Sequence, residues 1–156
     1  MPLEWVVSGV EEVATLQPAK LDSDWLLLIV SHPNCGFLAL ATKAISENAQ
    51  LQQRIYGHAK WIMGQGGVFD IDRYQNWNQM YPNAAVTLVH RNTDWPLESL
   101  SATPTFYFLQ NCKVAESFSG WPKDGSHHVK VIAALDRIAP ASTPTQAQTL
   151  SNKINK

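Results

Sequence analysis

A run of six apolar residues, Trp25 to Val30, most constrains what this 156-residue chain can fold into. The run is continuously apolar and does not alternate with polar residues, which is typical of a strand buried on both faces of a sheet. Such a strand needs a covering layer on each side, so the run predicts an α/β domain with this segment in the middle of its sheet. The chain is long enough for one buried core and too short for two of ordinary size.

Cys35 follows this strand closely, at the point where apolar residues begin to recur at helical spacing from Gly36 to about Asn48. The first amides of a helix carry a partial positive charge, which favours a thiolate over a thiol. We therefore interpret Cys35 as a candidate nucleophile. The alternative is a structural cysteine, because free cysteine is among the most buried residue types.

A second informative segment is Thr103-Pro104-Thr105, which precedes an aromatic strand expected over residues 105–110. A further strand over 113–118 would close an antiparallel hairpin around Asn111-Cys112. Thr-Pro pairs are common at strand starts, so this segment is a weak signal when taken alone.

Taken in order, these pieces resemble the thioredoxin superfamily: a hydrophobic strand, Cys-Gly at a helix start, Thr-Pro-Thr before an aromatic strand, and a hairpin closing on Gly120. The resemblance covers roughly residues 20–51 and 84–139. It implies an α/β, three-layer thioredoxin-like fold with a mixed central sheet and helices on both faces. It also implies a cis peptide bond at Pro104, against the reactive cysteine, with an extended substrate paired to the backbone there. The expected catalytic residue is Cys35, and the expected substrate-binding residues are Thr103, Pro104, His32, Gly36 and Phe37.

The chain departs from the thioredoxin pattern at two positions. Leu38 stands where the second cysteine of C-x-x-C would be, so a mixed disulfide on Cys35 has no local thiol to expel it. Ile29 stands where thioredoxins bury an acidic residue. The run Cys35-Gly36-Phe37-Leu38 also resembles the C-G-F-S of monothiol glutaredoxins, with Leu in place of Ser. Leu38 and Ile29 thus replace two groups that a dithiol cycle needs, whereas the nucleophile Cys35 is kept.

Most of the remaining chain is expected to be helical. Ser8-Gly9-Val10-Glu11 has the form of a capping box and predicts a helix over 9–17. Helical patterns from Leu51 to Met63 and from about Asp70 to Met80 predict a helical insertion over 52–83, before a strand over 84–90. The last helix is expected over 126–138. We assign residues 1–139 to one domain and predict that residues 140–156, rich in Pro, Ser, Thr, Gln and Asn, form a disordered tail.

Composition limits which partners and which cellular compartment we expect for this protein. The net charge of −1 gives no electrostatic reason to expect nucleic acid or an acidic membrane as a partner. The N-terminal residues show no basic segment leading into an apolar stretch, so a cytoplasmic location is the default expectation. Two cysteines make no disulfide framework, and Cys112, at the expected hairpin tip, is interpreted as a surface thiol.

Histidines offer two weaker candidates. His32 lies three residues before Cys35, where it could lower the thiol pKa, hold a metal, or simply be exposed on a loop. No metal is expected, because the chain has no second ligand pair of similar spacing. His127 and His128 are a weaker pair, since adjacent residues on a helix do not face one site.

Three functions remain open at this point. The leading hypothesis is a thiol–disulfide oxidoreductase or isomerase that acts through Cys35 alone on protein or small-molecule thiols and disulfides. It needs no bound cofactor, only an external thiol such as glutathione. The second is a thioredoxin-fold binding module without redox activity, and the third is glutathione-dependent iron–sulfur binding. The sequence does not indicate the oligomeric state.

Overall fold

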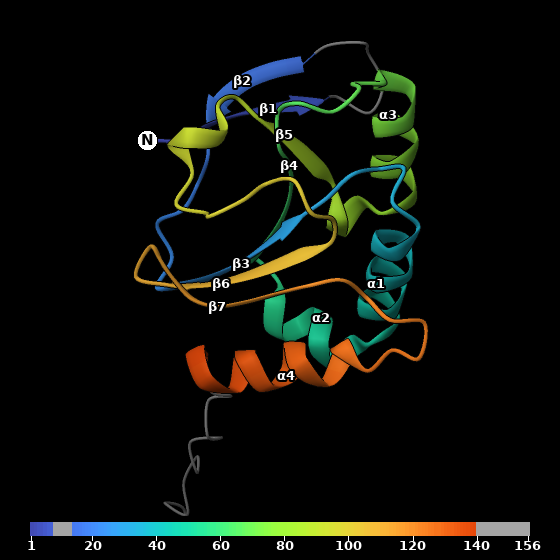
Figure 1. Cartoon of the computed structure of the whole chain (residues 1–156), viewed down its shortest axis with the longest axis vertical. Coiled ribbons are helices and arrows are strands. Elements are labelled where there is room, and N and C mark those ends of the chain that lie inside the picture. The colour runs from blue at the N-terminus through green and yellow to red at the C-terminus, as the bar shows by residue number, and fades with distance from the viewer. Residues whose placement is uncertain (8–13, 140–156) are drawn as a thin grey trace, which may run out of the picture.

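The computed structural model describes residues 1–7 and 14–139, which form one mixed sheet with helices packed against it (Figure 1). The elements, in chain order, are β1 (Leu3–Val7), β2 (Ala14–Pro18), β3 (Trp25–Val30), α1 (Gly36–Glu47), α2 (Ala49–Ile55), β4 (Ala59–Met63), α3 (Ile71–Met80), η1 (Pro82–Ala84), β5 (Val86–Val89), η2 (Asn92–Asp94), β6 (Thr105–Gln110), β7 (Lys113–Ser119) and α4 (His127–Ile138).

The sheet has the strand order β2-β1-β5-β4-β3-β6-β7. The strands β3, β4 and β5 are parallel to one another, whereas β1, β2, β6 and β7 join through antiparallel pairs. The predicted strand Trp25–Val30 is β3, which is paired on both sides and has five of its six residues buried. The expected α/β class with a mixed central sheet is confirmed.

The four α-helices of the described residues all pack on one face of the sheet. Alternate residues of β3 point to opposite faces, and Leu27 and Ile29 join a core cluster that contains residues of α1, α2, α3 and α4. The order β3, β4, β5 runs in one direction across the sheet, and right-handed crossovers in one direction place their helices on the same side. The expectation of helices on both faces is therefore wrong for the described residues.

The opposite face is covered by irregular chain. Leu28 and Val30 of β3 pack there against Ala19 and Trp95, which belong to the segments 19–24 and 91–104. Tyr107 ties the second of these segments to the sheet, since its hydroxyl donates to the carbonyl of Ser99 at 2.8 Å and accepts from the Ser99 amide at 3.1 Å. The third layer of the fold is thus made of tethered loops.

Two expected helices are corrected. Ala14–Pro18, placed in the helix over 9–17, is the edge strand β2, paired antiparallel with β1; residues 8–13 lie outside the described residues. The helix expected over 51–63 ends at Ile55, because Gly57 takes a positive φ of 76° and turns the chain into β4. The segment 52–83 is therefore not a helical insertion throughout, since β4 lies in the sheet between β3 and β5.

Other expectations agree with the structure. The strand expected over 84–90 is β5, the hairpin over 105–118 is β6 with β7, and the last helix is α4. The residues at the tip, Asn111 and Cys112, both have positive φ, of 50° and 62°, as a two-residue type I′ hairpin turn requires. None of the helices in the described ranges is long and apolar enough to span a membrane.

Candidate functional site

Cys35 lies between the carboxyl end of β3 and the first turn of α1, as the N-cap residue of that helix. Its amide donates to the carbonyl of His32 at 2.8 Å, which closes the turn that leads into the helix. The thiol is partly buried and donates to the carbonyl oxygen of Thr103 at 3.3 Å. No side chain caps the helix and no acidic residue lies in its first turn, so the positive end of the helix faces the cysteine without a competing carboxylate.

Thr103 and Pro104 form the opposite wall of the site. The Thr103–Pro104 peptide bond is cis. Pro104 is buried, and its carbonyl accepts from the Gly120 amide at 2.7 Å, while the Thr105 hydroxyl donates to Ala102 at 2.7 Å. The backbone that faces the cysteine is therefore held at both ends. The Cys35 sulfur thus brings the start of α1 together with the segment that contains Thr103, 68 residues later in the sequence.

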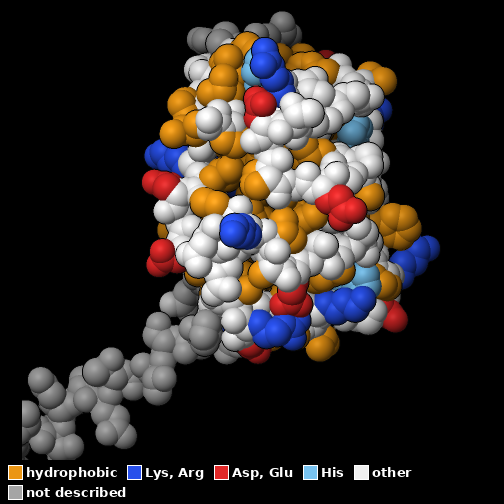
Figure 2. All heavy atoms as spheres, turned by 60° about the vertical axis from the view of Figure 1, so that its left-hand side comes forward, with side chains coloured by type: hydrophobic (Ala, Val, Ile, Leu, Met, Phe, Trp, Pro, Cys, Tyr) orange, Lys and Arg blue, Asp and Glu red, His pale blue; other side chains and the backbone are white. Residues whose placement is uncertain are grey.

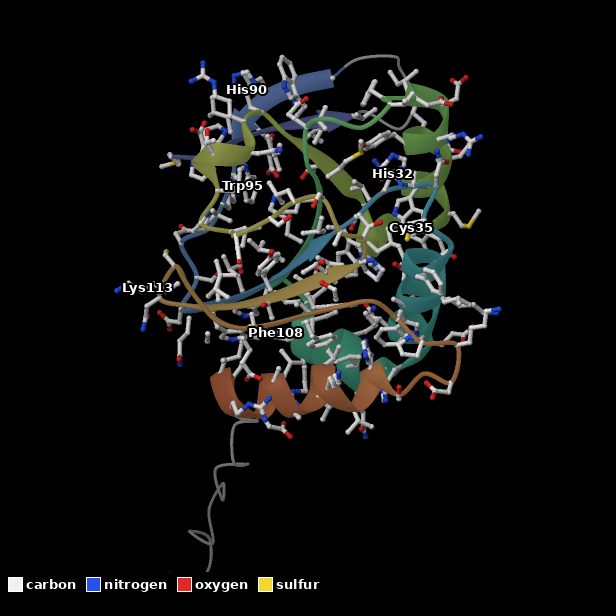
Figure 3. The ribbon with its side chains drawn as sticks, in the orientation of Figure 1. His32, Cys35, His90, Trp95, Phe108 and Lys113 are labelled. Atoms are coloured by element: carbon white, nitrogen blue, oxygen red, sulfur yellow. The ribbon has the colours of Figure 1, made fainter. Side chains whose placement is uncertain are left out.

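His32 lies beside the cysteine, but its ring is held by other groups (Figure 3). The amide of Asn34 donates to His32 Nδ1 at 3.1 Å, which assigns Nδ1 as an acceptor. On its other side the ring approaches the loop after β4, since a Cβ built on Gly67 would lie 3.5 Å from His32 Nε2. His32 thus lines the space next to the cysteine and makes its hydrogen bond with the turn.

Gly36, Phe37 and Leu38 take different positions in the first turn of α1. A Cβ on Gly36 would meet no atom within 4 Å, so this residue leaves the space beside Cys35 open. The Phe37 ring is 52 % exposed. Leu38, at the position of the second cysteine in thioredoxins, is fully buried and packs in the core beneath the helix.

The helix α3 contributes to the site in a way that its sequence pattern does not predict. Its N-cap residue Asp70 accepts from the amides of Asp72 and Arg73, and the Arg73 guanidinium pairs with Asp70 at 3.3 Å. Arg73 also donates to the side-chain oxygen of Asn34, next to Cys35. This contact joins segments that are 39 residues apart, and no local sequence pattern predicts it.

The loop after β4 is the second part of the site that the sequence did not predict. A Cβ on Gly64 would lie 2.7 Å from Leu100 Cβ and 2.8 Å from the Leu100 carbonyl, so only glycine allows this approach. The close contact brings the loop 64–67 against the segment that leads to Thr103. A pocket of about 360 Å³ lies between them, lined by residues that include His32, Gly67 and Thr103. The glycines in the run Gly64-Gln65-Gly66-Gly67 are the sequence signal that fits such a close backbone approach.

The remaining candidates lie elsewhere. His127 Nδ1 is 2.7 Å from the Gly120 carbonyl and His128 Nε2 is 3.0 Å from Asn48, so the two rings face different partners. Within the described ranges no three residues of the types His, Cys, Asp or Glu gather as a metal site would require. Both cysteines are free. Cys112 is exposed next to Lys113, which lies at the far end of the sheet from Cys35 (Figure 3).

Burial affects one titratable group near the site. Tyr74 of α3 is buried, and its hydroxyl contacts the sulfur of Met63 at the end of β4. Burial raises the pKa of Tyr74 well above its ordinary value. The phenol therefore stays protonated and acts as a packing and hydrogen-bonding group behind the His32 side of the pocket.

The strand order, the crossovers and the pairing of a helix-capping cysteine with a Thr-Pro segment define a thioredoxin-like fold. The solution structure of a "Putative Thioredoxin from Neisseria meningitidis" matches with a TM-score of 0.54 over 99 % of this chain and 97 % of that chain, at 11 % sequence identity. At this identity the likeness shows the fold alone. No family model matches the sequence, and no curated protein matches it.

Proposed function

We propose that this protein catalyses thiol–disulfide exchange through Cys35 as its single reactive thiol. The observation that carries the proposal is the position of the Cys35 sulfur, at the uncapped start of α1 and 3.3 Å from the Thr103 carbonyl. A thiolate there is oriented by a helix N-terminus and lies next to backbone groups that can pair with an extended substrate. Leu38 and the remote Cys112 leave the site with one thiol.

The chemistry follows from the single sulfur. The Cys35 thiolate attacks one sulfur of a substrate disulfide, the S–S bond breaks, and the other sulfur leaves as a thiolate that takes up a proton. The product is a mixed disulfide on Cys35. An external thiolate then attacks this mixed disulfide, releases the exchanged product and regenerates the Cys35 thiolate. The cycle exchanges partners without net oxidation of the protein, which suits reshuffling or removal of mixed disulfides.

The test is an exchange assay with a neutral small disulfide, hydroxyethyl disulfide, and an external thiol. The wild-type chain and Cys112→Ser are expected to accelerate exchange and to show a mixed-disulfide adduct by intact mass. Cys35→Ser is expected to lose both. Acceleration that survives in Cys35→Ser, or a wild-type rate equal to the uncatalysed rate, would overturn the proposal.

A second candidate is a binding module that uses the same surface without chemistry. Three large apolar residues are exposed near the site: Phe37 at 52 %, Val68 at 82 % and Phe69 at 45 %. Val68 and Phe69 directly follow Gly67, whose backbone lies beside the His32 ring. Exposed apolar residues next to one another are typical of protein-binding surfaces. An inert Cys35 together with partner binding that Phe37→Ser abolishes would favour this function.

A further inference from the structure

A groove leads away from the Cys35 site along the carboxyl ends of the parallel strands. Two pockets of about 360 and 340 Å³ share Gln65, Leu100 and Ser101 in their linings, so they adjoin, and together they are called the groove here. In open α/β sheets, ligands commonly bind in the crevice outside the carboxyl ends of the strands. The near part follows β3 and β4, and the far part is lined by Asn92, Thr93, Leu97, Glu98 and Ser99.

The groove comes close to Cys35 through Thr103. Thr103 and His32 line its near part, and the Thr103 carbonyl is the partner of the Cys35 thiol. A substrate chain joined to Cys35 through a disulfide can therefore pass Thr103 and continue toward Glu98. The groove can therefore contact substrate residues that lie beyond the disulfide itself.

Its walls are built by polar groups that bond to each other. The Gln65 amide donates to Asn92 Oδ1 at 2.8 Å, and Asn92 Nδ2 donates back to the Gln65 carbonyl at 3.2 Å. The Gln65 side-chain amide group donates to the carbonyls of Val89 at 2.8 Å and His90 at 3.4 Å. The Ser99 and Ser101 hydroxyls lie 2.8 Å apart. These bonds fix the shape of the groove and engage the side-chain amide groups of Gln65 and Asn92.

Two of the groups left over, on Gln65 and Glu98, are acceptors. Two carbonyls face Gln65 Nε2, which assigns that atom as nitrogen and leaves the Gln65 side-chain oxygen as a spare acceptor. Glu98 has no ion pair or hydrogen bond within the described part of the chain, and no lysine or arginine lines either pocket there. Arg91 and Asp94 flank the far part without lining it. Figure 2 shows acidic and basic side chains spread among hydrophobic and other side chains on this side of the molecule, with several of both signs close together near its lower end.

We propose that this groove selects polypeptide disulfides that carry a lysine or arginine side chain near the cysteine. The inference rests on the proposed function and names its substrate class. Spare carboxylate and amide oxygens, with no lysine or arginine among them, favour a ligand that brings hydrogen-bond donors and positive charge. An acidic substrate would meet Glu98 without a compensating cation.

The experiment measures exchange rates for short cysteine peptides joined by a disulfide to a chromophoric aryl thiol. Cys35 attacks the peptide sulfur, and the aryl thiolate, the better leaving group, is released and detected. Each peptide carries one lysine, glutamine or glutamate, moved residue by residue away from the cysteine and placed on either side of it. At one placement the lysine peptide is expected to react about two- to fivefold faster than the glutamine peptide, the effect of a partly exposed ion pair.

Two variants test whether the groove causes the preference for the lysine peptide. Glu98→Gln is expected to erase the preference for lysine, so that the lysine and glutamine peptides react at equal rates. Asp94→Asn, a matched loss of a carboxylate that does not line the groove, is expected to keep the preference. Equal rates for all charges at every placement, or a preference that persists in Glu98→Gln, would overturn the inference. If the glutamine peptides do not react with Cys35, the proposed function itself fails, which is a separate outcome.

Discussion

At the scale of single residues, some glycines allow another segment to come very close, and others border open space. Gly64 touches Leu100, whereas Gly36 faces empty space beside the cysteine. The sequence shows that both are glycines and gives no sign of this difference. It depends on which distant segment passes the Cα atom, and only the fold supplies that segment.

Gly64→Ala is therefore expected to destabilise the protein by about 1–3 kcal/mol, because the new methyl group overlaps Leu100. Gly36→Ala, at the first position of α1, is the matched control and is expected to be neutral or stabilising by up to ~1 kcal/mol. Urea unfolding of the two variants measures the difference. Equal midpoints for the two variants would contradict the close contact at Gly64.

Cys112 is a second residue whose backbone decides its effect. It has a φ of 62° at the hairpin tip, in the left-handed region that glycine adopts without strain. Cys112→Gly is expected to raise the free energy of unfolding by about 0.5–1 kcal/mol, whereas Cys112→Ser keeps the strained backbone and is expected to change little. Denaturant midpoints measure both, and a Cys112→Gly midpoint below that of Cys112→Ser would show that the turn tolerates the cysteine.

At the scale of elements, a buried ion pair links three strands on the loop-covered face. Glu4 of β1 is 1 % exposed; its carboxylate pairs with Lys60 of β4 at 2.5 Å and accepts from the Thr87 hydroxyl of β5 at 2.8 Å. Lys60→Met leaves this carboxylate buried without its cation and is expected to cost roughly 2–4 kcal/mol.

The double variant Glu4→Leu with Lys60→Met removes both charges and is expected to recover most of that loss. Thermal or urea unfolding of the single and double variants provides the measurement. A double variant less stable than Lys60→Met alone would contradict the dominant role of the uncompensated charge.

A second pair joins β7 to α4 and gives a pH dependence. The hydrogen bond from Arg137 holds the pKa of Glu116 below its ordinary value, so the ionised form is favoured in the folded state. The stabilisation is present above the unfolded-state pKa and is lost as the pH falls through the lower folded-state pKa. Arg137→Gln is expected to lower the melting temperature slightly at neutral pH, because the pair is largely exposed.

The same substitution is expected to have no effect once Glu116 is protonated in acid. Melting curves of the wild type and Arg137→Gln across the acidic range test this. A difference that stays constant from neutral to acidic pH would assign the effect to something other than the Glu116 charge.

The elements also show where sequence patterns succeed. β3, α1, the β6–β7 hairpin and α4 were predictable because each has a clear period and a boundary signal in its own residues. β4 was missed because Trp61, Ile62 and Met63 continue a helical pattern after Leu51 and Ile55. The boundary lies in Gly57, whose positive φ ends α2. β2 was missed because pairing with β1 overrides a local helix signal.

At the scale of the whole molecule, the candidate site is a property of one end of the sheet. The carboxyl ends of β3, β4 and β5 and the start of β6 meet there, so Cys35, Thr103 and the loop 64–67 come together. The sequence predicted the first two through their resemblance to a known pattern. It could not predict the Arg73 contact or the groove, since both depend on how α3 and segment 91–104 fold over the sheet.

The central claim is that Cys35 is a working nucleophile, and a competition within one chain tests it most directly. The folded wild-type protein is treated with a limiting amount of iodoacetamide, and the modification of Cys35 and Cys112 is compared by mass spectrometry of the digested chain. Cys112 is the more exposed thiol, so accessibility alone favours it. We predict that Cys35 is alkylated faster, by about tenfold or more, as a nucleophile at the uncapped start of α1 requires. Faster alkylation of Cys112 would contradict the account.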